Sequence, residues 1–290
     1  MNKITFLIQL DRTGNKFLQR GIFPQIQSEL ATIIYDSTAM TIYELIVNNK
    51  GTMPVLENNM NYLITISWDL IIEHKDITER INNYFPASMV LFIARSQSTI
   101  IPSFYKYAYM KLGGILSYRS FANKRIATPY YEYDRGVKRL MRQFGSARFK
   151  VLFFEDMKRD VQSYVASLLR HAGIMDAKQK IVFDTIDTNA SPSDFDIAIN
   201  LLVNRIFFPF SFVLPNILVQ KSNYFVANVL QSFASRIGVA KLLSVKLCDD
   251  PAIATKIQDR YANSNRRLFD ILGVDPSTMN YPVLPNQSNF

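Results

Sequence analysis

Four short apolar runs stand out along the chain, and each has the length of a β-strand. They cover residues 4–10, 62–66, 89–93 and 149–154. Continuous apolar runs of this kind are typical of strands buried on both faces of a parallel sheet. Polar residues and then a helical pattern follow each run, so strands and helices alternate. The pattern predicts an α/β fold with a central parallel sheet, which binds its ligands at the carboxyl ends of the strands.

Beyond Asp156 the pattern becomes mainly helical. Helical spacing covers residues 160–171, 194–204, 223–235 and 251–272, and no strand pattern returns. We expect residues 1–290 to form a single domain with a helical C-terminal subregion, in which residues 189–247 are a helical insertion or cap. No Gly/Ser-rich linker marks an independent unit.

Two apolar segments bear on membrane contact. The first run is followed at once by charged residues and is too short for a signal peptide or a membrane span, so we expect a cytoplasmic protein. Residues 206–220 carry no charge, but Pro209 and Pro215 interrupt them, and they fall short of the roughly 20 residues of a spanning helix. They form either a buried aromatic segment packed on the domain or a peripheral membrane contact.

Charge and composition limit the classes of molecule that the protein is expected to bind. Lys and Arg number 33 against 24 Asp and Glu, and the net charge of +9 favours an anionic partner. No zinc-finger spacing and no basic region with heptads is present, so we expect a small anionic ligand and no specific nucleic acid. One cysteine, Cys248, and two histidines give neither a disulfide framework nor a thiolate metal cluster, and we expect no metal.

A polar loop with a single glycine follows the first predicted strand. The backbone N–H groups of Gly14, Asn15 and Lys16 are predicted to point at one anion at the start of the next helix, where Arg12 and Lys16 add positive charge. A triphosphate-binding loop requires a second glycine and a Lys-Ser/Thr pair, whereas here Phe17 follows Lys16. The alternative is an ordinary turn that uses Gly14 for its dihedral freedom.

A second polar segment follows the predicted strand at residues 89–93. Arg95 stands at the strand's carboxyl end, and Ser103 lies eight residues later in the next helix. A bidentate guanidinium and a neutral hydroxyl suit a second phosphate. The alternative is a surface arginine and a serine that faces solvent.

These segments resemble a known family. Residues 8–19 read IQLDRTGNKFLQ, and the second segment places Arg95, Gln97, Ser103 and Tyr105 in the order RxQxxxxxSxY. Together with FFEDMKRDVQSYVASLLRHAGI and YANSNRRLFDILGVD, they are similar to the sulfotransferases that use 3′-phosphoadenosine 5′-phosphosulfate (PAPS), in particular bacterial carbohydrate-type members, whose first loop reads IGLxKTGTTFLQ. The similar segments occur in order along most of the chain.

The resemblance implies a P-loop-like three-layer fold and a PAPS-dependent sulfotransferase that acts on a hydroxyl of a glycan or glycolipid. Arg95 and Ser103 would hold the 3′-phosphate of PAPS. Transfer requires in-line positioning, cations at the leaving phosphate and a base for the acceptor, but no metal. Arg12 and Lys16 would supply the cations. The 5′-phosphosulfate would be bound by the first loop, which consists of Arg12, Thr13, Gly14, Asn15, Lys16 and Phe17.

A carboxylate after the second strand is the predicted general base. Asp69 occupies the place where many relatives carry a carboxylate or histidine, and its alternative role is a helix N-cap. Glu73 and His74 fall a turn further on and are weaker candidates. The pair Glu155–Asp156 is expected to cap the following helix, although the likeness puts it near the nucleotide.

The first loop departs from the family pattern at several positions. Arg12 replaces the usual lysine, Asn15 and Lys16 replace two threonines, and Gln9 replaces a glycine in the strand. Lys16 is positioned to restore the ammonium group. The rival hypothesis is a catalytically impaired relative that binds nucleotide or glycan without transfer.

Overall fold

The computed structural model describes part of the chain: residues 3–10, 13–14, 17–29, 32–33, 37–58, 60–111, 116–174, 199, 202–203, 226, 248–276 and 279–283. The apolar segment 206–220 lies outside these residues, as do nearly all of the predicted helices at 194–204 and 223–235 and of the predicted cap at 189–247.

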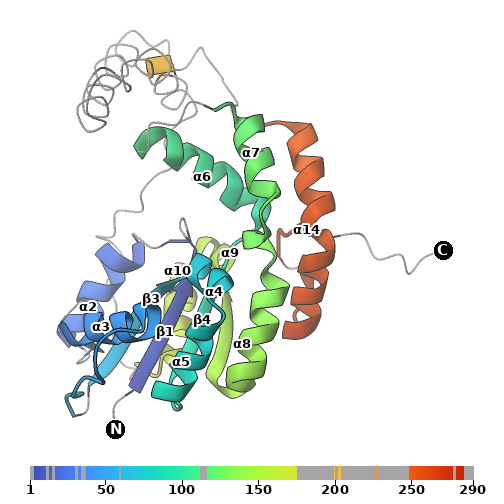
Figure 1. Cartoon of the computed structure of the whole chain (residues 1–290). Coiled ribbons are helices and arrows are strands. Elements are labelled where there is room, and N and C mark those ends of the chain that lie inside the picture. Colours follow the sequence, from blue (N-terminus) through green and yellow to red (C-terminus); the bar gives the residue numbers. More distant parts are fainter. Residues whose placement is uncertain are drawn as a thin grey trace. The chain divides into compact units, whose positions relative to one another are not determined.

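Strands and helices alternate along the described chain, as predicted (Figure 1). The strands are β1 (Lys3–Gln9), β2 (Thr32–Ile33), β3 (Asn61–Ser67), β4 (Met89–Ala94) and β5 (Phe149–Phe153). The α-helices are α2 (Phe23–Glu29), α3 (Ser37–Tyr43), α4 (Trp68–Glu73), α5 (Asp76–Tyr84), α6 (Gln97–Lys111), α7 (Tyr118–Ile126), α8 (Tyr133–Arg148), α9 (Phe154–Arg159), α10 (Val161–His171) and α14 (Pro251–Leu272). The π-helices η1 (Leu18–Ile22) and η2 (Glu44–Asn48) and the 3₁₀ turn η3 (Pro129–Tyr131) complete the list.

The five strands form one parallel sheet in the order β2-β3-β1-β4-β5. The four predicted strands are present within one residue of their predicted ends. The sequence pattern missed β2 because two residues are too few to show a period. β1 lies in the middle of the sheet and leads into the turn at Thr13 and Gly14, as expected of a P-loop-like fold.

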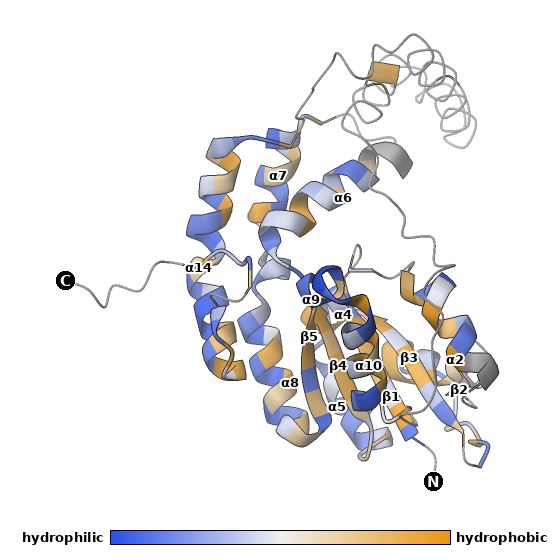
Figure 2. Cartoon of the chain, turned by 180° about the vertical axis from the view of Figure 1, so that it is seen from behind, coloured by the Kyte–Doolittle hydropathy of each residue, from blue (hydrophilic) through white to orange (hydrophobic). Residues whose placement is uncertain are grey.

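One face of the sheet is covered by η1, α2 and α10. Leu7 and Leu91 of the sheet pack there against Ile22 of η1 and Leu168 of α10 in one buried apolar cluster. Hydrophobic residues dominate the strands (Figure 2). Because successive side chains of a strand point to opposite faces of the sheet, the neighbours of these residues point to the other face.

The opposite face is covered by α4, α5 and α8. Trp68 at the start of α4 stacks on Phe92 of β4, with ring centroids 4.1 Å apart, and Tyr133 of α8 meets both rings edge-on. Gly136 of α8 passes so close that a Cβ there would lie 2.3 Å from a Trp68 ring carbon. A glycine is therefore required at this helix position by packing. Helices on both faces confirm the predicted three-layer α/β fold.

Helix ends follow local chemistry. Pro24 lies within the continuous helical run formed by η1 and α2, and the π-turns of η1 directly precede this residue, which has no N–H to donate. Asp160 is the N-cap of α10 and accepts a hydrogen bond from the Ser163 N–H at 3.0 Å. The helix predicted at 251–272 is α14, with identical bounds.

The chain divides into two compact units. The first contains residues 1–97, 129–189 and 261–290, and the second contains residues 98–128 and 190–260. The sheet and the helices on both of its faces belong to the first unit. The prediction of a single domain with a cap stays a prediction.

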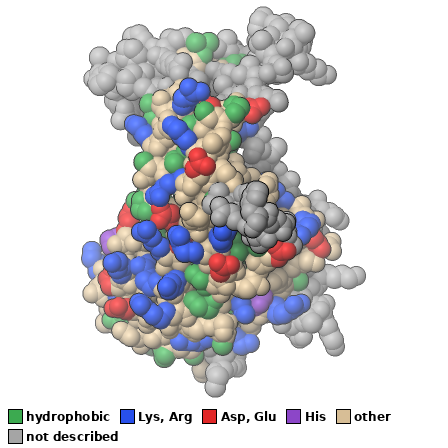
Figure 3. Space-filling model, turned by 90° about the vertical axis from the view of Figure 1, so that its right-hand side faces the viewer, with side chains coloured by type: hydrophobic (Ala, Val, Ile, Leu, Met, Phe, Trp, Pro, Cys, Tyr) green, Lys and Arg blue, Asp and Glu red, His purple; other side chains and the backbone are tan. Residues whose placement is uncertain are grey.

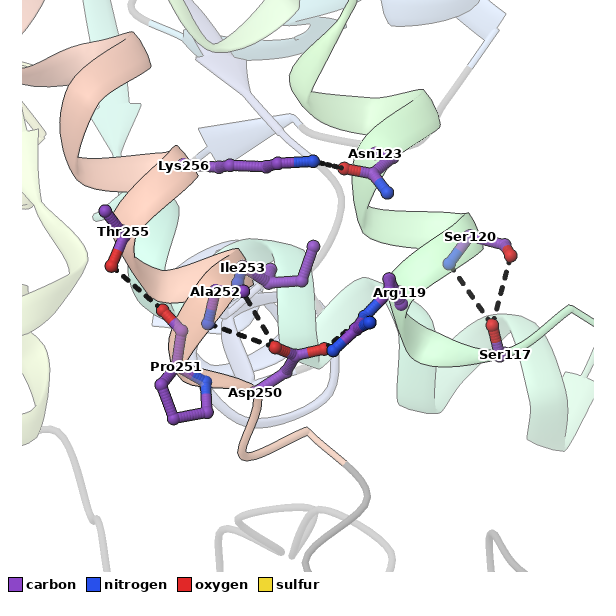
Figure 4. A network of polar contacts seen from close by, with 10 residues as sticks. All are labelled: Ser117, Arg119, Ser120, Asn123, Asp250, Pro251, Ala252, Ile253, Thr255 and Lys256. Carbon is purple, nitrogen blue, oxygen red and sulfur yellow. Dashed lines mark hydrogen bonds and ion pairs between the residues drawn. The ribbon is translucent and has the colours of Figure 1, made fainter.

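The second unit is tied together by polar contacts between α7 and the start of α14 (Figure 4). The Arg119 guanidinium pairs with the Asp250 carboxylate at 2.8 Å, and this bond lowers the pKa of Asp250. Asp250 also accepts from the Ala252 N–H, and the Lys256 ammonium donates to the Asn123 side chain at 3.1 Å. None of the described helices combines the length and the apolar character that crossing a bilayer requires.

Candidate active site

The carboxyl ends of four parallel strands meet at one edge of the sheet. Gln9, the last residue of β1, is in register with Ser67 of β3 and with Ile93 of β4, and Ala94 of β4 pairs with Phe153 of β5. The polar segments that follow these strands therefore emerge at the same edge. They contain Thr13, Asp69, Arg95 and Glu155.

The turn after β1 is closed by its own residues. The buried Thr13 hydroxyl donates to the Leu10 carbonyl at 2.6 Å, and the Gly14 carbonyl accepts from the Leu18 N–H at 3.0 Å. Gly14 has a φ of 85°, and a Cβ on it would lie 3.1 Å from the Met157 side chain. The turn thus requires a glycine on grounds of dihedral angle and of space, independently of any ligand.

The charged residues of this loop, Arg12 and Lys16, and the neighbouring Asn15 lie outside the described residues. Their roles toward the 5′-phosphosulfate stay predictions. The Phe17 side chain is buried in the apolar cluster beside Leu18, and its role in cofactor binding also stays a prediction.

Arg95 is buried at the end of β4, with only 8% of its surface exposed. Its guanidinium carbon lies 4.4 Å from the centroid of the Phe154 ring, a cation–π contact. Its carbonyl accepts a hydrogen bond from the Tyr133 hydroxyl at 2.8 Å. The alternative of a surface arginine is therefore wrong. Ser103, on α6 in the second unit, is also buried, so the alternative of a solvent-facing serine is wrong as well.

The Phe154 ring connects the two predicted anion-binding segments. A Cβ built on Gly14 would lie 3.3 Å from a carbon of this ring, and the Arg95 guanidinium packs on the same ring. The turn after β1 and the arginine after β4 therefore flank a single aromatic side chain. This closeness is what two anion sites need if one nucleotide is to occupy both.

Gln97 is fixed by a buried amide pair. Its side-chain amide donates to the Asn265 side chain at 2.9 Å, and the Asn265 amide donates back at 3.0 Å. The Gln97 amide also donates to the Tyr131 carbonyl, and that of Asn265 to the Pro282 carbonyl. Both side chains are fully buried and satisfied, which locks the segment after β4 to the C-terminal part of the chain.

Glu155 is bound to the same segment. One carboxylate oxygen accepts from the Ser96 N–H at 3.0 Å. Burial raises the pKa of Glu155, and the hydrogen bond from Ser96 and the charge of Arg95 oppose that rise. Glu155 and Asp156 lie in the first turn of α9, as their acidic character favours, but the N-cap of that helix is Phe153 and the cap of α10 is Asp160, so the prediction that the pair is a helix cap is wrong. Glu155 faces the Arg95 segment instead.

The candidate base lies on the other side of β1. Asp69 is exposed in the first turn of α4, and the N-cap of that helix is Ser67. The alternative of Asp69 as a helix N-cap is therefore wrong, and its role as a base stays a prediction. Glu73 accepts a hydrogen bond from the Tyr130 hydroxyl, and His74 is exposed at the helix end.

Gln9 is the departure from the family pattern that the structure describes. Only 3% of its surface is exposed, and neither atom of its amide makes a hydrogen bond within the described chain. A buried amide without partners costs about 1–3 kcal/mol in proteins. The glycine that relatives carry at this position avoids that cost.

A sequence model of the sulfotransferase family matches residues 11–177, which is more than half of the chain. The chain belongs to the sulfotransferase family. The expected family and an enzyme of sulfuryl transfer are thus confirmed. The match covers the Gly14 turn, Arg95 and Glu155, whereas Asn265 lies beyond it.

Solved structures of other sulfotransferases are similar to this chain. One, from Alicyclobacillus acidocaldarius, is 15% identical with a TM-score of 0.44, and the likeness covers 78% of this chain and 96% of that one. A mouse sulfotransferase complexed with PAP is 12% identical with a TM-score of 0.41, over 67% and 69% of the two chains. No sequence of a curated protein matches this chain. The family assignment rests on the family match alone.

Sequence reasoning missed the supporting residues of this sulfotransferase site. Tyr133 and Phe154 carry no pattern that separates them from core aromatics. Asn265 stands within YANSNRRLFDILGVD, a segment singled out by its family likeness, but a sequence alone does not pair it with Gln97 across 168 positions.

One face of the molecule carries many positively charged side chains. Figure 3 shows many Lys and Arg side chains on the face that it presents. Exposed cations on α8 include Arg135, Lys138 and Arg142, at helical spacing along one side. Such a surface attracts anionic molecules and speeds their encounter with the protein.

Proposed function

We propose that this sulfotransferase transfers the sulfuryl group of PAPS to a hydroxyl of a glycan or glycolipid. The choice of donor rests on one observation: the Gly14 turn and the Arg95 guanidinium both contact the Phe154 ring. Two anion-binding segments that contact the same ring suit a nucleotide with phosphates at both its 3′ and 5′ positions.

In this proposal Arg95 binds the 3′-phosphate as a charged hydrogen-bond donor. Its backbone is held by the Tyr133 hydroxyl, and the next residues are held by Glu155 and Asn265. The site is therefore formed before the nucleotide arrives, which lowers the entropic cost of binding. The role of Ser103 at the same phosphate, which the resemblance implies, stays a prediction.

Transfer itself requires charge stabilisation and a base. Arg12 and Lys16 neutralise the phosphate oxygen that leaves as the S–O bond breaks. Asp69 takes the proton of the acceptor hydroxyl as the new S–O bond forms. Its exposed place in α4, at the end of the strand next to β1, leaves it accessible to an acceptor of the size of a sugar.

The choice of a glycan or glycolipid acceptor, like the cytoplasmic location, rests on the resemblance of the motifs and on the N-terminal pattern. Residues 206–220 are a candidate for peripheral membrane contact, which would bring the enzyme to a glycolipid.

Calorimetric titration with 3′-phosphoadenosine 5′-phosphate (PAP) tests the donor. The wild-type chain is expected to bind PAP, and transfer of labelled sulfate from PAPS to a panel of glycans and glycolipids is expected to identify an acceptor. Absence of PAP binding would overturn the proposed donor. Binding of PAP without transfer to any acceptor in the panel would favour the catalytically impaired relative.

A further inference from the structure

Two cations share the Phe154 ring. The Arg95 guanidinium carbon lies 4.4 Å from the ring centroid, and the Lys158 ammonium lies 5.4 Å from it. Lys158 and Phe154 are four positions apart on α9, so their side chains lie on the same face of that helix. Both positive groups therefore contact the same aromatic ring.

Lys158 forms no ion pair or hydrogen bond with any residue that the structure describes. The nearest carboxylate in sequence on its C-terminal side, Asp160, caps α10, and Asp156 pairs with Arg159. Glu155 accepts a hydrogen bond from the Ser96 N–H. Asp156 and Asp160 are thus engaged elsewhere, whereas the Glu155 carboxylate still interacts electrostatically with Lys158.

The two cations also act on each other. Partial shielding from water lowers the pKa of Lys158, and the positive charge of Arg95 lowers it further, while Glu155 acts in the opposite direction. The two positive charges repel each other, and the single negative charge of Glu155 offsets this repulsion only in part. The position of Lys158 is therefore suited to a bound anion.

A phosphate monoester carries about two negative charges near neutral pH, more than one guanidinium neutralises. We propose that Lys158 is a second cation of the 3′-phosphate site at Arg95 and that it makes this chain select nucleotides with a 3′-phosphate. This inference rests on the proposed function and adds to it a residue that determines specificity.

The test compares two nucleotides on two variants. Calorimetric titration measures the affinity of PAP, which has a 3′-phosphate, and of adenosine 5′-monophosphate, which lacks it. Lys158→Met is expected to weaken PAP binding about tenfold and to leave the affinity for the monophosphate within about twofold, because only one ligand loses a charged partner. Lys138→Met removes the same charge from the exposed side of α8 and is expected to change neither affinity. Lys158→Arg is expected to keep most of the PAP affinity.

Each result decides between the hypotheses. Unchanged PAP affinity in Lys158→Met, with wild-type binding intact, would overturn the role of Lys158 and leave the proposed function standing. Equal losses for both nucleotides would also overturn it, since they would indicate a general effect on charge or folding. Absence of PAP binding by the wild-type chain would remove the proposed function and this inference together.

Discussion

The segments after β4 and after β3 emerge at the same edge of the sheet but are built differently. After β4, Arg95 and Gln97 are buried, and hydrogen bonds from Tyr133 and Asn265 hold them. After β3, Asp69 is exposed in the first turn of a short helix. A donor nucleotide that is common to a family suits a rigid, preformed site, whereas an acceptor that differs between members suits an open one. The difference predicts separate effects on binding and on turnover.

The largest effect is expected for Asp69→Asn. Loss of the general base is expected to lower kcat by at least about a hundredfold, while the affinity for PAP stays unchanged. Steady-state kinetics and calorimetric titration measure the two quantities. Glu73→Gln, one turn further along α4, is the matched control and is expected to retain turnover. Retained activity in Asp69→Asn would assign the base to another residue.

Arg95→Ala tests the other segment. We expect PAP binding to weaken by about 2 kcal/mol or more, roughly 30-fold, because the phosphate loses a charged hydrogen-bond donor. Titration of the purified variant with PAP gives the value, and its thermal unfolding shows whether the fold is intact. An unchanged affinity in a folded variant would refute the assignment of Arg95 to the 3′-phosphate.

The support beneath that segment is tested by Asn265→Leu. The change leaves the buried Gln97 amide without its reciprocal partner, which is expected to lower the free energy of unfolding by about 1–3 kcal/mol. Denaturant unfolding measures the loss. Asn263→Leu, at an exposed position of the same helix, is the control and is expected to have little effect. Equal stability of the two variants would mean that the amide pair does not hold the segment.

The smallest effect is a dependence on pH that involves Glu155. Because burial raises its pKa, the folded state favours the protonated form, and that stabilisation is lost as pH rises through the raised pKa. Glu155→Gln keeps an oxygen for the Ser96 N–H and removes the charge. The variant is therefore expected to gain thermal stability over wild type at pH 8, and the gain is expected to shrink toward pH 4. A gain that grows on acidification would contradict the direction of the shift.

Much of the sheet was predictable because its signals are local. Strands buried on both faces must be apolar throughout, so the runs that became β1, β3, β4 and β5 stand out without knowledge of their neighbours. The two residues of β2 give no such signal. The helix at 251–272 was predicted with its exact bounds since Pro251 marks its start and its apolar spacing is regular.

In the candidate site, too, only the features with a local sequence signal were predictable. The sequence by itself determined where polar residues follow buried strands, and with them Gly14, Asp69 and Arg95, because the carboxyl ends of parallel strands share an edge. Only the tertiary structure decided what surrounds them: Phe154 between Gly14 and Arg95, Asn265 against Gln97, and Lys158 on the same Phe154 ring as Arg95. Such contacts join residues from different elements, and a period along one strand or helix carries no information about which distant side chain will meet it.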